Sequence, residues 1–369
     1  MNFEFSSDQR ELQNQLSRQL ADAFPLERVM RVLEGDLAER KLMWREFVEL
    51  GYLGMAIPEQ YGGVGYGYLE LCLMAQEIGR LGIPVPMLSN IYLAAEAIVQ
   101  FGSEQQKQNW LPKILGGEVN ATFAWSEDDN GQAPDVINCQ LDTGLLCGVK
   151  TPVPDTDMAD IAVVVANGRN GELALCLVDL KQQGVSLQPL EVIDEASPHA
   201  SISFDGAMAE VLGGVAVDLD RLFNRAAVLL AFDQVGGAQQ CLEMSKSYAA
   251  ERFVFGRAIA SYQALKHKMV DMYVFNELAL SHGYFAAWAL ENDADELAQA
   301  AAGVRLAAIK AYEYAAAETI QIHGGVGYTW EYPCHIYFKR SRITAASLGG
   351  KRRWQNKLVS SLIESGATI

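Results

Sequence analysis

The chain has 369 residues, enough for two or three domains of the usual ~100–200 residues. Half of the residues are apolar and 20% are charged, so the composition excludes a disordered or collagen-like chain. The net charge of −17 argues against a general nucleic-acid-binding protein, because phosphate backbones attract basic surfaces.

The cysteines, histidines and N-terminus indicate a cytoplasmic protein. Six scattered cysteines without a CxxC pair suit reduced thiols better than a disulfide framework. Five histidines without HxxxH or HExxH spacing give no metal signature. The polar start MNFEFSSDQRELQNQ lacks the apolar run of a signal peptide, and no apolar stretch reaches the ~20 residues that span a bilayer. We therefore expect no metal and no membrane span.

The first 118 residues have the periodicity of helices. In DQRELQNQLSRQLADAF, Leu12, Leu16 and Leu20 repeat at four-residue spacing. A second helix, ERKLMWREFVELG, is expected to stop at Gly51, since glycine often ends a helix. A proline and several glycines make IPEQYGGVGYG a loop, after which helices resume with YLELCLMAQEIGRLG and before Trp110. This region is predicted to be an N-terminal helical domain.

The sequence pattern changes near Val119, where short β-prone segments replace the helical periodicity. Glycine, proline, asparagine and aspartate separate these segments at a spacing typical of an antiparallel sandwich or barrel. The segments are ATFAW, LLCGV, IAVVVA, ELALCLVDL, VSLQPL and ASISF. We therefore predict a central antiparallel β domain over residues 119–214.

From Val215 onward the chain is alanine-rich and helical again. Four long helices are expected, in DLDRLFNRAAVLLAFDQVGGAQQCLEMSKSYAAERF, in SYQALKHKMVDMYVFNELALSHGYFAAWAL, in ELAQAAAGVRLAAIKAYEYAAAETIQIHG and after Gly350. Long amphipathic helices of this kind predict a bundle. The expected fold class is α+β, with an N-terminal helical domain over 1–118, a central β domain over 119–214 and a C-terminal four-helix bundle over 215–369. Without a GxGxxG motif or alternating βα units, a nicotinamide Rossmann domain is disfavoured.

Five motifs, in this order, resemble the acyl-CoA dehydrogenase family of flavoenzymes. They are LGYLGMAIPEQYGGVG (Leu50–Gly65), QEIGR (Gln76–Arg80), FGSEQQKQNWLPKILGGE (Phe101–Glu118), ERFVFGRAIASYQALKHKMVDM (Glu251–Met272) and QIHGGVGYTWEYPCHIYFKR (Gln321–Arg340). The resemblance covers nearly the whole chain and extends to a divergent subgroup that includes steroid side-chain acyl-CoA dehydrogenase subunits. It implies an FAD-dependent enzyme that desaturates acyl-CoA thioesters, including bulky ones.

The resemblance also implies an FAD half-site that serves mostly the neighbouring subunit. The positions that match the family's FAD contacts are Arg252, Phe255, Gln263, Gln321, Gly324 and Gly325. A guanidinium offers paired donors to phosphate, and glycines let backbone N–H groups approach a dinucleotide closely. A GGVG run alone indicates only a helix end and a turn. Beside Arg252 and Gln263 in matching order, we interpret it as part of the cofactor site.

Two segments of the β region depart from the family pattern on the flavin side. WSEDDNGQAPD stands where the family has a Thr-Glu-Pro-Gly-x-Gly-Ser-Asp segment, although Ser126 keeps a hydroxyl that can bond to the flavin. GVKTPVPD replaces Gly-x-Lys-x-Trp-Ile-Thr-Asn, so Pro152 and Pro154 take the tryptophan and threonine positions. Since proline has neither N–H nor hydroxyl, we expect weaker flavin contacts there.

Neither position at which the family keeps its glutamate base holds an acid. Gly349 stands at the usual position, and Ala226 stands at the alternative one on the long helix. Asp233 follows Ala226 by two helical turns on about the same face, within the apolar run AVLLAFDQVGG. Asp233 is therefore the candidate catalytic base, since desolvation makes a carboxylate a better proton acceptor. The alternative is that Asp233 pairs with Arg252 or with a partner chain.

The C-terminal segment is basic, with seven basic residues and one acid from Lys339 onward. Within it, Lys351 and Arg352 are candidate contacts for phosphates of the acyl-CoA substrate or of a partner's FAD, and the alternative is a solvated helix face.

Two functions of different class remain open at this point. The first is an FAD-dependent acyl-CoA dehydrogenase with an atypical base, which passes electrons to an electron-transfer flavoprotein. The second is a non-catalytic subunit that lends its FAD half-site to a heteromeric acyl-CoA dehydrogenase whose other chain supplies the glutamate. The chain is accordingly expected either as a homo-oligomer or as a heterotetramer with a second acyl-CoA dehydrogenase subunit. A third interpretation is that the chain is a relative of these enzymes whose reduced flavin is reoxidised by oxygen.

Overall fold

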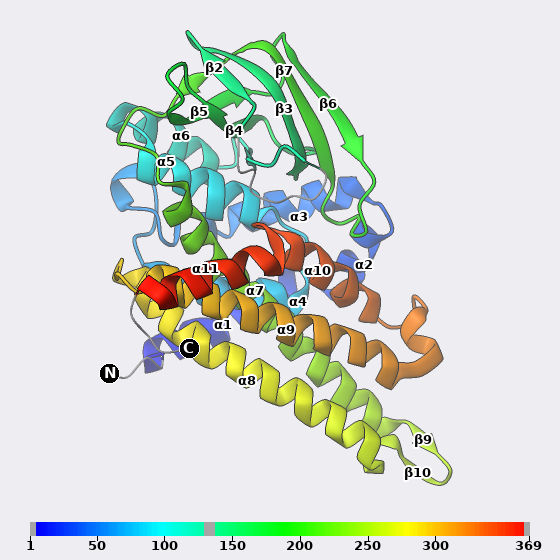
Figure 1. Ribbon diagram of the computed structural model, residues 1–369. Helices are drawn as coiled ribbons and strands as arrows, with labels where there is room; N and C mark the ends of the chain where they lie inside the picture. Colours follow the sequence, from blue (N-terminus) through cyan, green and yellow to red (C-terminus); the bar gives the residue numbers. More distant parts are fainter. Residues whose placement is uncertain (1–4, 129–136, 365–369) are drawn as a thin grey trace.

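The computed structural model describes residues 5–128 and 137–364. The β sheet lies at one end of the molecule, the N-terminal helices lie next to it, and long C-terminal helices form the other end (Figure 1). A core of buried side chains runs through the helical part, and a smaller second core lies on the sheet.

Short polar side chains cap three of the N-terminal helices. Ser6 caps the first helix and Ser103 the last, each in a capping box with the glutamine three residues on. The helices are α1 (Ser7–Ala23), α2 (Leu26–Leu33), α3 (Leu37–Glu49), α4 (Tyr68–Leu81), α5 (Glu96–Phe101) and α6 (Glu104–Leu115). A π-helix, η3 (Met87–Ala95), precedes α5 and was not predicted from the sequence. Such wide turns often lie beside functional sites.

Each of the six predicted β segments contains a strand. Within the described residues the strands are β1 (Ala121–Ala124), β2 (Gln140–Asp142), β3 (Leu145–Pro154), β4 (Ile161–Asn167), β5 (Leu173–Asp179), β6 (Val185–Leu190), β7 (His199–Met208) and β8 (Glu210–Val211). They form one sheet in the order β6-β7-β3-β2-β4-β5-β8, with β1 beside β4. Most pairs are antiparallel, as predicted, but β4 runs parallel to β1 and β2, so the sheet is mixed. The reason is that the β2–β3 hairpin lies between β1 and β4 in sequence, and the chain returns to start β4 in the same direction.

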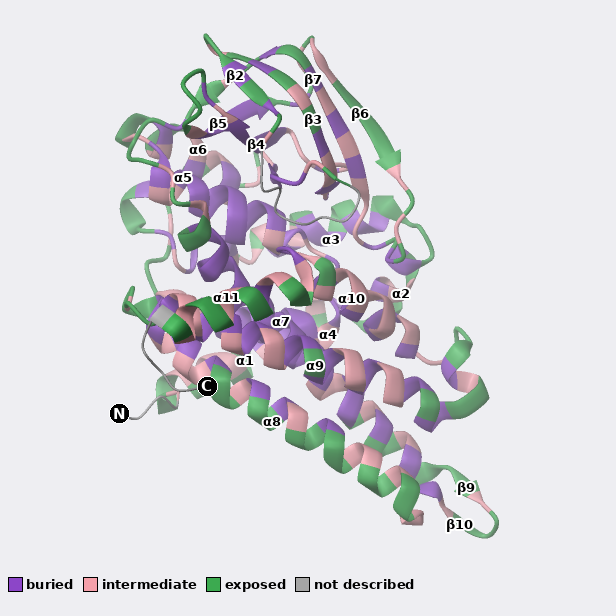
Figure 2. Ribbon diagram, in the orientation of Figure 1, coloured by how far each residue is buried: buried purple, intermediate pink, exposed green. Residues whose placement is uncertain are grey.

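The C-terminal region contains the four predicted long helices and one more. They are α7 (Leu219–Glu251), α8 (Gln263–Glu291), α9 (Leu297–His323), α10 (Cys334–Ala346) and α11 (Gly350–Glu364), and α10 is the one that the sequence analysis missed. A small hairpin, β9 (Phe253–Val254) and β10 (Arg257–Ala258), joins α7 to α8. Figure 2 shows α7 buried along most of its length, whereas α8 exposes one face. Within residues 5–128 and 137–364, no helix combines the length and apolarity needed to cross a membrane.

Helices α4 and α7 cross with their backbones in contact. A Cβ added at Gly79 would lie 1.8 Å from the carbonyl oxygen of Asp233, and one at Gly236 would lie 1.9 Å from that of Gln76. Real side chains do not come this close to backbone, so both positions require glycine. The crossing therefore fixes the turn of α7 that carries Asp233.

We expect Gly236→Ala to lower the stability of the fold by about 1–3 kcal/mol, because the added methyl group forces the two helices apart. Thermal unfolding of the purified protein measures this. Gly303→Ala is the matched control in α9, since its Cβ would meet only His282 at 3.6 Å. That control should be neutral or stabilising by up to about 1 kcal/mol, as alanine is the better helix former. Equal effects of the two substitutions would contradict the close crossing.

Candidate active site

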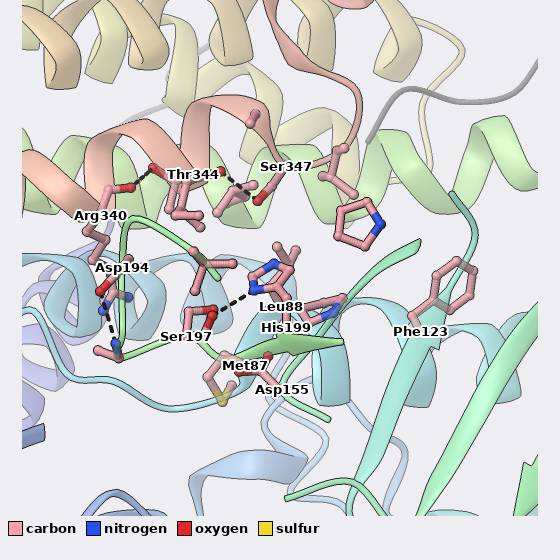
Figure 3. A pocket seen from close by; sticks show the side chains of 18 of the residues that line it. Met87, Leu88, Phe123, Asp155, Asp194, Ser197, His199, Arg340, Thr344 and Ser347 are labelled. Atoms are coloured by element: carbon pink, nitrogen blue, oxygen red, sulfur yellow. Dashed lines mark hydrogen bonds between the residues drawn. The ribbon is translucent and has the colours of Figure 1, made fainter. Parts of the chain in front are cut away.

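A cavity of about 570 Å³ lies between the sheet, η3, α7 and the α10–α11 connection (Figure 3). Much of its wall is apolar, with side chains that include Met87, Leu88, Leu93, Phe123, Trp125, Leu230, Ile343 and Leu348. Two of the predicted site residues, Ser126 and Asp233, also line this cavity. A mostly apolar cavity with a few polar groups is the usual form of a site for a small organic ligand.

Ser126 lies at the end of the cavity formed by the sheet. Its side chain is fully buried, and its hydroxyl donates to the carbonyl oxygen of Asp128 at 3.3 Å. The backbone N–H of Thr151 donates to the carbonyl oxygen of Ser126 at 2.9 Å, which ties this segment to β3. Thr151 and Pro152 line the same end. The remainder of the WSEDDNGQAPD segment, residues 129–135, falls outside the described residues.

A buried ion pair holds this end of the cavity in place. The Nζ atom of Lys150 lies 2.6 Å from Oε1 of Glu127. The backbone N–H of Cys139 also donates to Oε1, and that of Asn138 donates to Oε2. Burial lowers the pKa of Lys150, and the hydrogen bond to Glu127 opposes this shift. Glu127, the residue that follows Ser126, therefore has a structural role.

Asp233 is held in an ion pair with Arg340 of α10. The Nη2 atom of Arg340 lies 2.7 Å from Oδ2 of Asp233, and Nε lies 3.4 Å from Oδ1, so both carboxylate oxygens face the guanidinium. Arg340 also donates to the carbonyl oxygen of Ile83 at 2.8 Å. Burial lowers the pKa of Arg340, but the charge of Asp233, the hydrogen bond to it and the nearby Tyr312 and Asp194 together raise the pKa overall. Pairing of Asp233 with Arg252 was wrong, because Arg252 lies on the surface beyond the end of α7.

A second carboxylate, Asp194, lies at the same end of the cavity and was not found from the sequence. Figure 3 shows Asp194 beside Arg340, on the opposite side of the view from Phe123. Asp194 is 5% exposed, and burial raises its pKa although the charge of Arg340 opposes the shift. It sits in the β6–β7 connection, where no sequence periodicity could have indicated burial.

Neither position of the family base, Ala226 or Gly349, lines the cavity. Leu348, Gly349 and Gly350 all have positive φ angles, and a Cβ at Gly349 would lie 2.5 Å from Cδ of Arg353. Ala226 is fully buried and is not among the residues that line the cavity. The turn before α11 is therefore shaped around glycine.

The predicted FAD half-site lies at the other end of the molecule. All of its residues are exposed, and they are Arg252, Phe255, Gln263, Gln321, Gly324 and Gly325. The ends of α7 and α9 meet there, since Tyr248 stacks on His323 with ring centroids 4.3 Å apart. The β9–β10 hairpin projects from this end, far from the sheet (Figure 1). One chain therefore cannot bring these residues to its own cavity.

The half-site has the features that a dinucleotide from another chain requires. Within the described part of the chain, the guanidinium of Arg252 has no hydrogen bond or ion pair. A Cβ at Gly324 or Gly325 would meet nothing within 4 Å, so the backbone of this turn is open to a ligand. Phe255 is 94% exposed with a φ angle of 51°, which places a large apolar ring in solvent. The residues fit FAD, whose pyrophosphate suits an arginine beside open backbone N–H groups.

The basic segment at the start of α11 divides into an outer and an inner part. Lys351 and Arg352 are both exposed, and neither lines the cavity. Arg353 turns inward, with its guanidinium 4.9 Å from the ring centre of Phe223 and 3.3 Å from a carboxylate oxygen of Asp220. Burial lowers the pKa of Arg353.

Comparison with known proteins agrees with these features. The family model "Acyl-CoA dehydrogenase, N-terminal domain" matches residues 6–118, and "Acyl-CoA dehydrogenase, C-terminal domain" matches residues 213–359. The acyl-CoA dehydrogenase IpdE2 of Mycobacterium tuberculosis is 30% identical over 341 residues, which is 91% of this chain and 92% of that protein.

Solved structures with the same fold include a steroid ACAD and a complex of two proteins. A variant of the steroid ACAD Tcur3481-Tcur3483 has a TM-score of 0.87 and 30% identity, covering 98% of this chain and 99% of that one. The ChsE4-ChsE5 complex of Mycobacterium tuberculosis has a TM-score of 0.87 and 25% identity, covering 99% of both chains.

We expect Arg252→Ala to weaken flavin retention by about ten- to a hundredfold, since it removes charged hydrogen bonds worth ~1.5–3 kcal/mol. The measurement is the flavin absorbance retained per chain after dialysis of the assembled protein. Arg169→Ala removes an equally exposed positive charge from the β region and should leave flavin retention unchanged. Full retention in Arg252→Ala would show that this half-site does not hold the cofactor.

Proposed function

Because this chain belongs to the acyl-CoA dehydrogenase family, whose enzymes oxidise the CH–CH bond of acyl-CoA with FAD, we propose that it is one subunit of a heteromeric acyl-CoA dehydrogenase. It lends its FAD half-site to a second chain, and that chain supplies the glutamate base. One observation carries the proposal. The exposed half-site around Arg252 is open, whereas Asp233 in the chain's own cavity is already paired with Arg340.

Desaturation requires removal of the α-proton and of the β-hydrogen of the thioester. FAD, when bound, supplies the acceptor for the β-hydrogen. In this chain, Arg252 and Gln263 would hold phosphate and ribose oxygens, and the Gly324-Gly325 turn would let backbone N–H groups approach.

Similarity to paired and steroid-related structures supports the heteromeric proposal and a bulky acyl group as the substrate. The wide cavity is consistent with a ring-bearing acyl group. An electron-transfer flavoprotein is the proposed electron acceptor, as the resemblance to dehydrogenases implies.

The alternative is that this chain catalyses in its own cavity with Asp233 as the base. Its support is that Asp233 lines the cavity on a buried turn of α7. Against it, the guanidinium of Arg340 faces both carboxylate oxygens of Asp233. Arg340 also lies across the cavity from Phe123, which belongs to the strand that leads to Ser126. A base needs a free oxygen directed at the substrate, and both oxygens of Asp233 face the guanidinium instead.

We expect the chain purified from its own cells to come with a second acyl-CoA dehydrogenase chain that carries the glutamate, with FAD and with acyl-CoA-dependent dye reduction. Expressed alone, it should lose ~10²–10⁴-fold of that activity, which is the usual worth of a positioned base. Native mass spectrometry and turnover measure this. A yellow, fully active protein from the single chain would overturn the proposal.

The control within the same experiment decides the role of Asp233. Removing one partner of a buried ion pair leaves an unpaired charge and costs about 3–5 kcal/mol. The double variant Asp233→Asn with Arg340→Gln removes both charges and keeps hydrogen-bonding groups of similar size. In the assembled enzyme it should retain turnover within a few fold. A loss of ~10²-fold or more with full flavin content would assign the base to Asp233.

We also propose that Lys351 and Arg352 contact phosphates of CoA or of the partner's FAD in the assembly. Their exposure at the start of α11 leaves them free to do so. Reversing both charges to glutamate should raise KM for acyl-CoA or weaken flavin retention, most strongly at low salt. Lys246→Glu in α7 is the exposed control, and an unchanged salt dependence would return both residues to a solvated helix face.

A further inference from the structure

The predicted FAD half-site is made of two parts that come from different helices. Arg252 ends α7, whereas Gly324 and Gly325 follow His323, the last residue of α9. A pyrophosphate that bonds to a guanidinium and to backbone N–H groups at once requires both parts at a fixed separation. The ends of the two helices must therefore be held together.

His323 makes the contact between the two helix ends. It is 4% exposed, and its ring stacks on that of Tyr248 of α7, with centroids 4.3 Å apart and an interplanar angle of 22°. Tyr332, in the α9–α10 connection, completes a cluster of three rings, with its centroid 5.1 Å from that of His323 and 5.4 Å from that of Tyr248. Aromatic rings at such distances attract one another beyond the effect of the area that they bury.

The orientation of the imidazole is fixed by its own helix. Nδ1 of His323 lies 2.8 Å from the carbonyl oxygen of Thr319, and because a carbonyl only accepts, Nδ1 carries the proton. Burial lowers the pKa of His323, which keeps the stacked ring uncharged at neutral pH. One turn below the ring, the hydroxyl of Thr319 lies 3.0 Å from the carbonyl oxygen of Cys241 and 3.0 Å from Oγ of Ser245, both in α7.

Each part of the half-site is attached directly to this cluster. The carbonyl oxygen of Tyr248 accepts the backbone N–H of Arg252 at 2.9 Å, and that of Arg252 accepts the backbone N–H of Ile259 at 2.8 Å. On the α9 side, the glycine turn folds back over His323, since a Cβ at Gly327 would lie 3.1 Å from Cβ of His323. A shift of the His323 ring would therefore change the distance between Arg252 and the turn.

We propose that His323 is a positioning residue of the FAD half-site, which keeps Arg252 and the Gly324-Gly325 turn in place relative to each other through its contact with Tyr248. This inference deepens the proposed function and rests on it in taking the FAD of another chain as the ligand. His323 acts through the two groups that it aligns, so its effect on FAD depends on the presence of Arg252.

The test is a double-mutant cycle on FAD affinity in the assembled protein, measured from the flavin fluorescence released on serial dilution. His323→Ala should weaken FAD binding about tenfold, and Tyr248→Ala should do the same, because it removes the stack from the α7 side. Tyr248→Phe keeps the ring and should stay within about twofold of the parent. Arg252→Ala combined with His323→Ala should bind FAD within about threefold of Arg252→Ala alone, since alignment matters only when the guanidinium is present.

Phe47→Leu is the control for a general loss of packing. Phe47 is fully buried and stacks on Trp44 with centroids 6.0 Å apart, in helix α3, which lies far from the β9–β10 hairpin (Figure 1). It should lower the thermal unfolding midpoint and leave FAD affinity unchanged. Native mass spectrometry verifies that each variant is assembled, and Tyr248→Ala against Tyr248→Phe decides the question if His323→Ala does not assemble.

Three results would overturn the inference. They are unchanged FAD affinity in the alanine variants of His323 and Tyr248, equal losses in Tyr248→Phe and Tyr248→Ala, and a loss in the double variant equal to the product of the two single losses. Unchanged affinity in Arg252→Ala would instead contradict the half-site on which the proposed function depends, so the two failures are distinguished.

Discussion

The close crossing of α4 and α7 is the constraint on which the cavity depends. Because Gly79 and Gly236 let the two backbones touch, the turn of α7 that carries Asp233 is pressed into the core and cannot move outward. A carboxylate buried in this way needs a positive partner, and Arg340 of α10 supplies it. The ion pair in turn fixes α10 against α7, which closes one end of the cavity.

The connection between α10 and α11 closes the cavity on another side. Arg305 is fully buried in α9 and donates to the carbonyl oxygen of Ser347 at 2.9 Å, while burial lowers its pKa to about 9. The left-handed turn at Leu348 then directs Arg353 inward, over Phe223. A glutamate at Gly349 would have to displace Arg353, so the missing base reflects the shape of a whole segment and not a single substitution.

Helices and strands with strong periodicity could be predicted from the sequence, and so could the family motifs. The π-helix at Met87–Ala95, helix α10 and the parallel pairing of β1 with β4 could not, because each depends on packing between distant segments. Asp233 was found because it interrupts an apolar run on one helix. Its partner Arg340 lies 107 residues away in sequence, and no local pattern connects the two.

The polar end of the cavity is better explained by a ligand than by stability. A buried ion pair is often no more stable than apolar side chains of the same volume, because the desolvation of two charges offsets their attraction. The walls near Leu88, Leu93 and Leu230 show that this fold accommodates apolar residues around the cavity. Yet Asp194, Asp233 and Arg340 converge on one end of it. For the fold alone, that convergence is a cost.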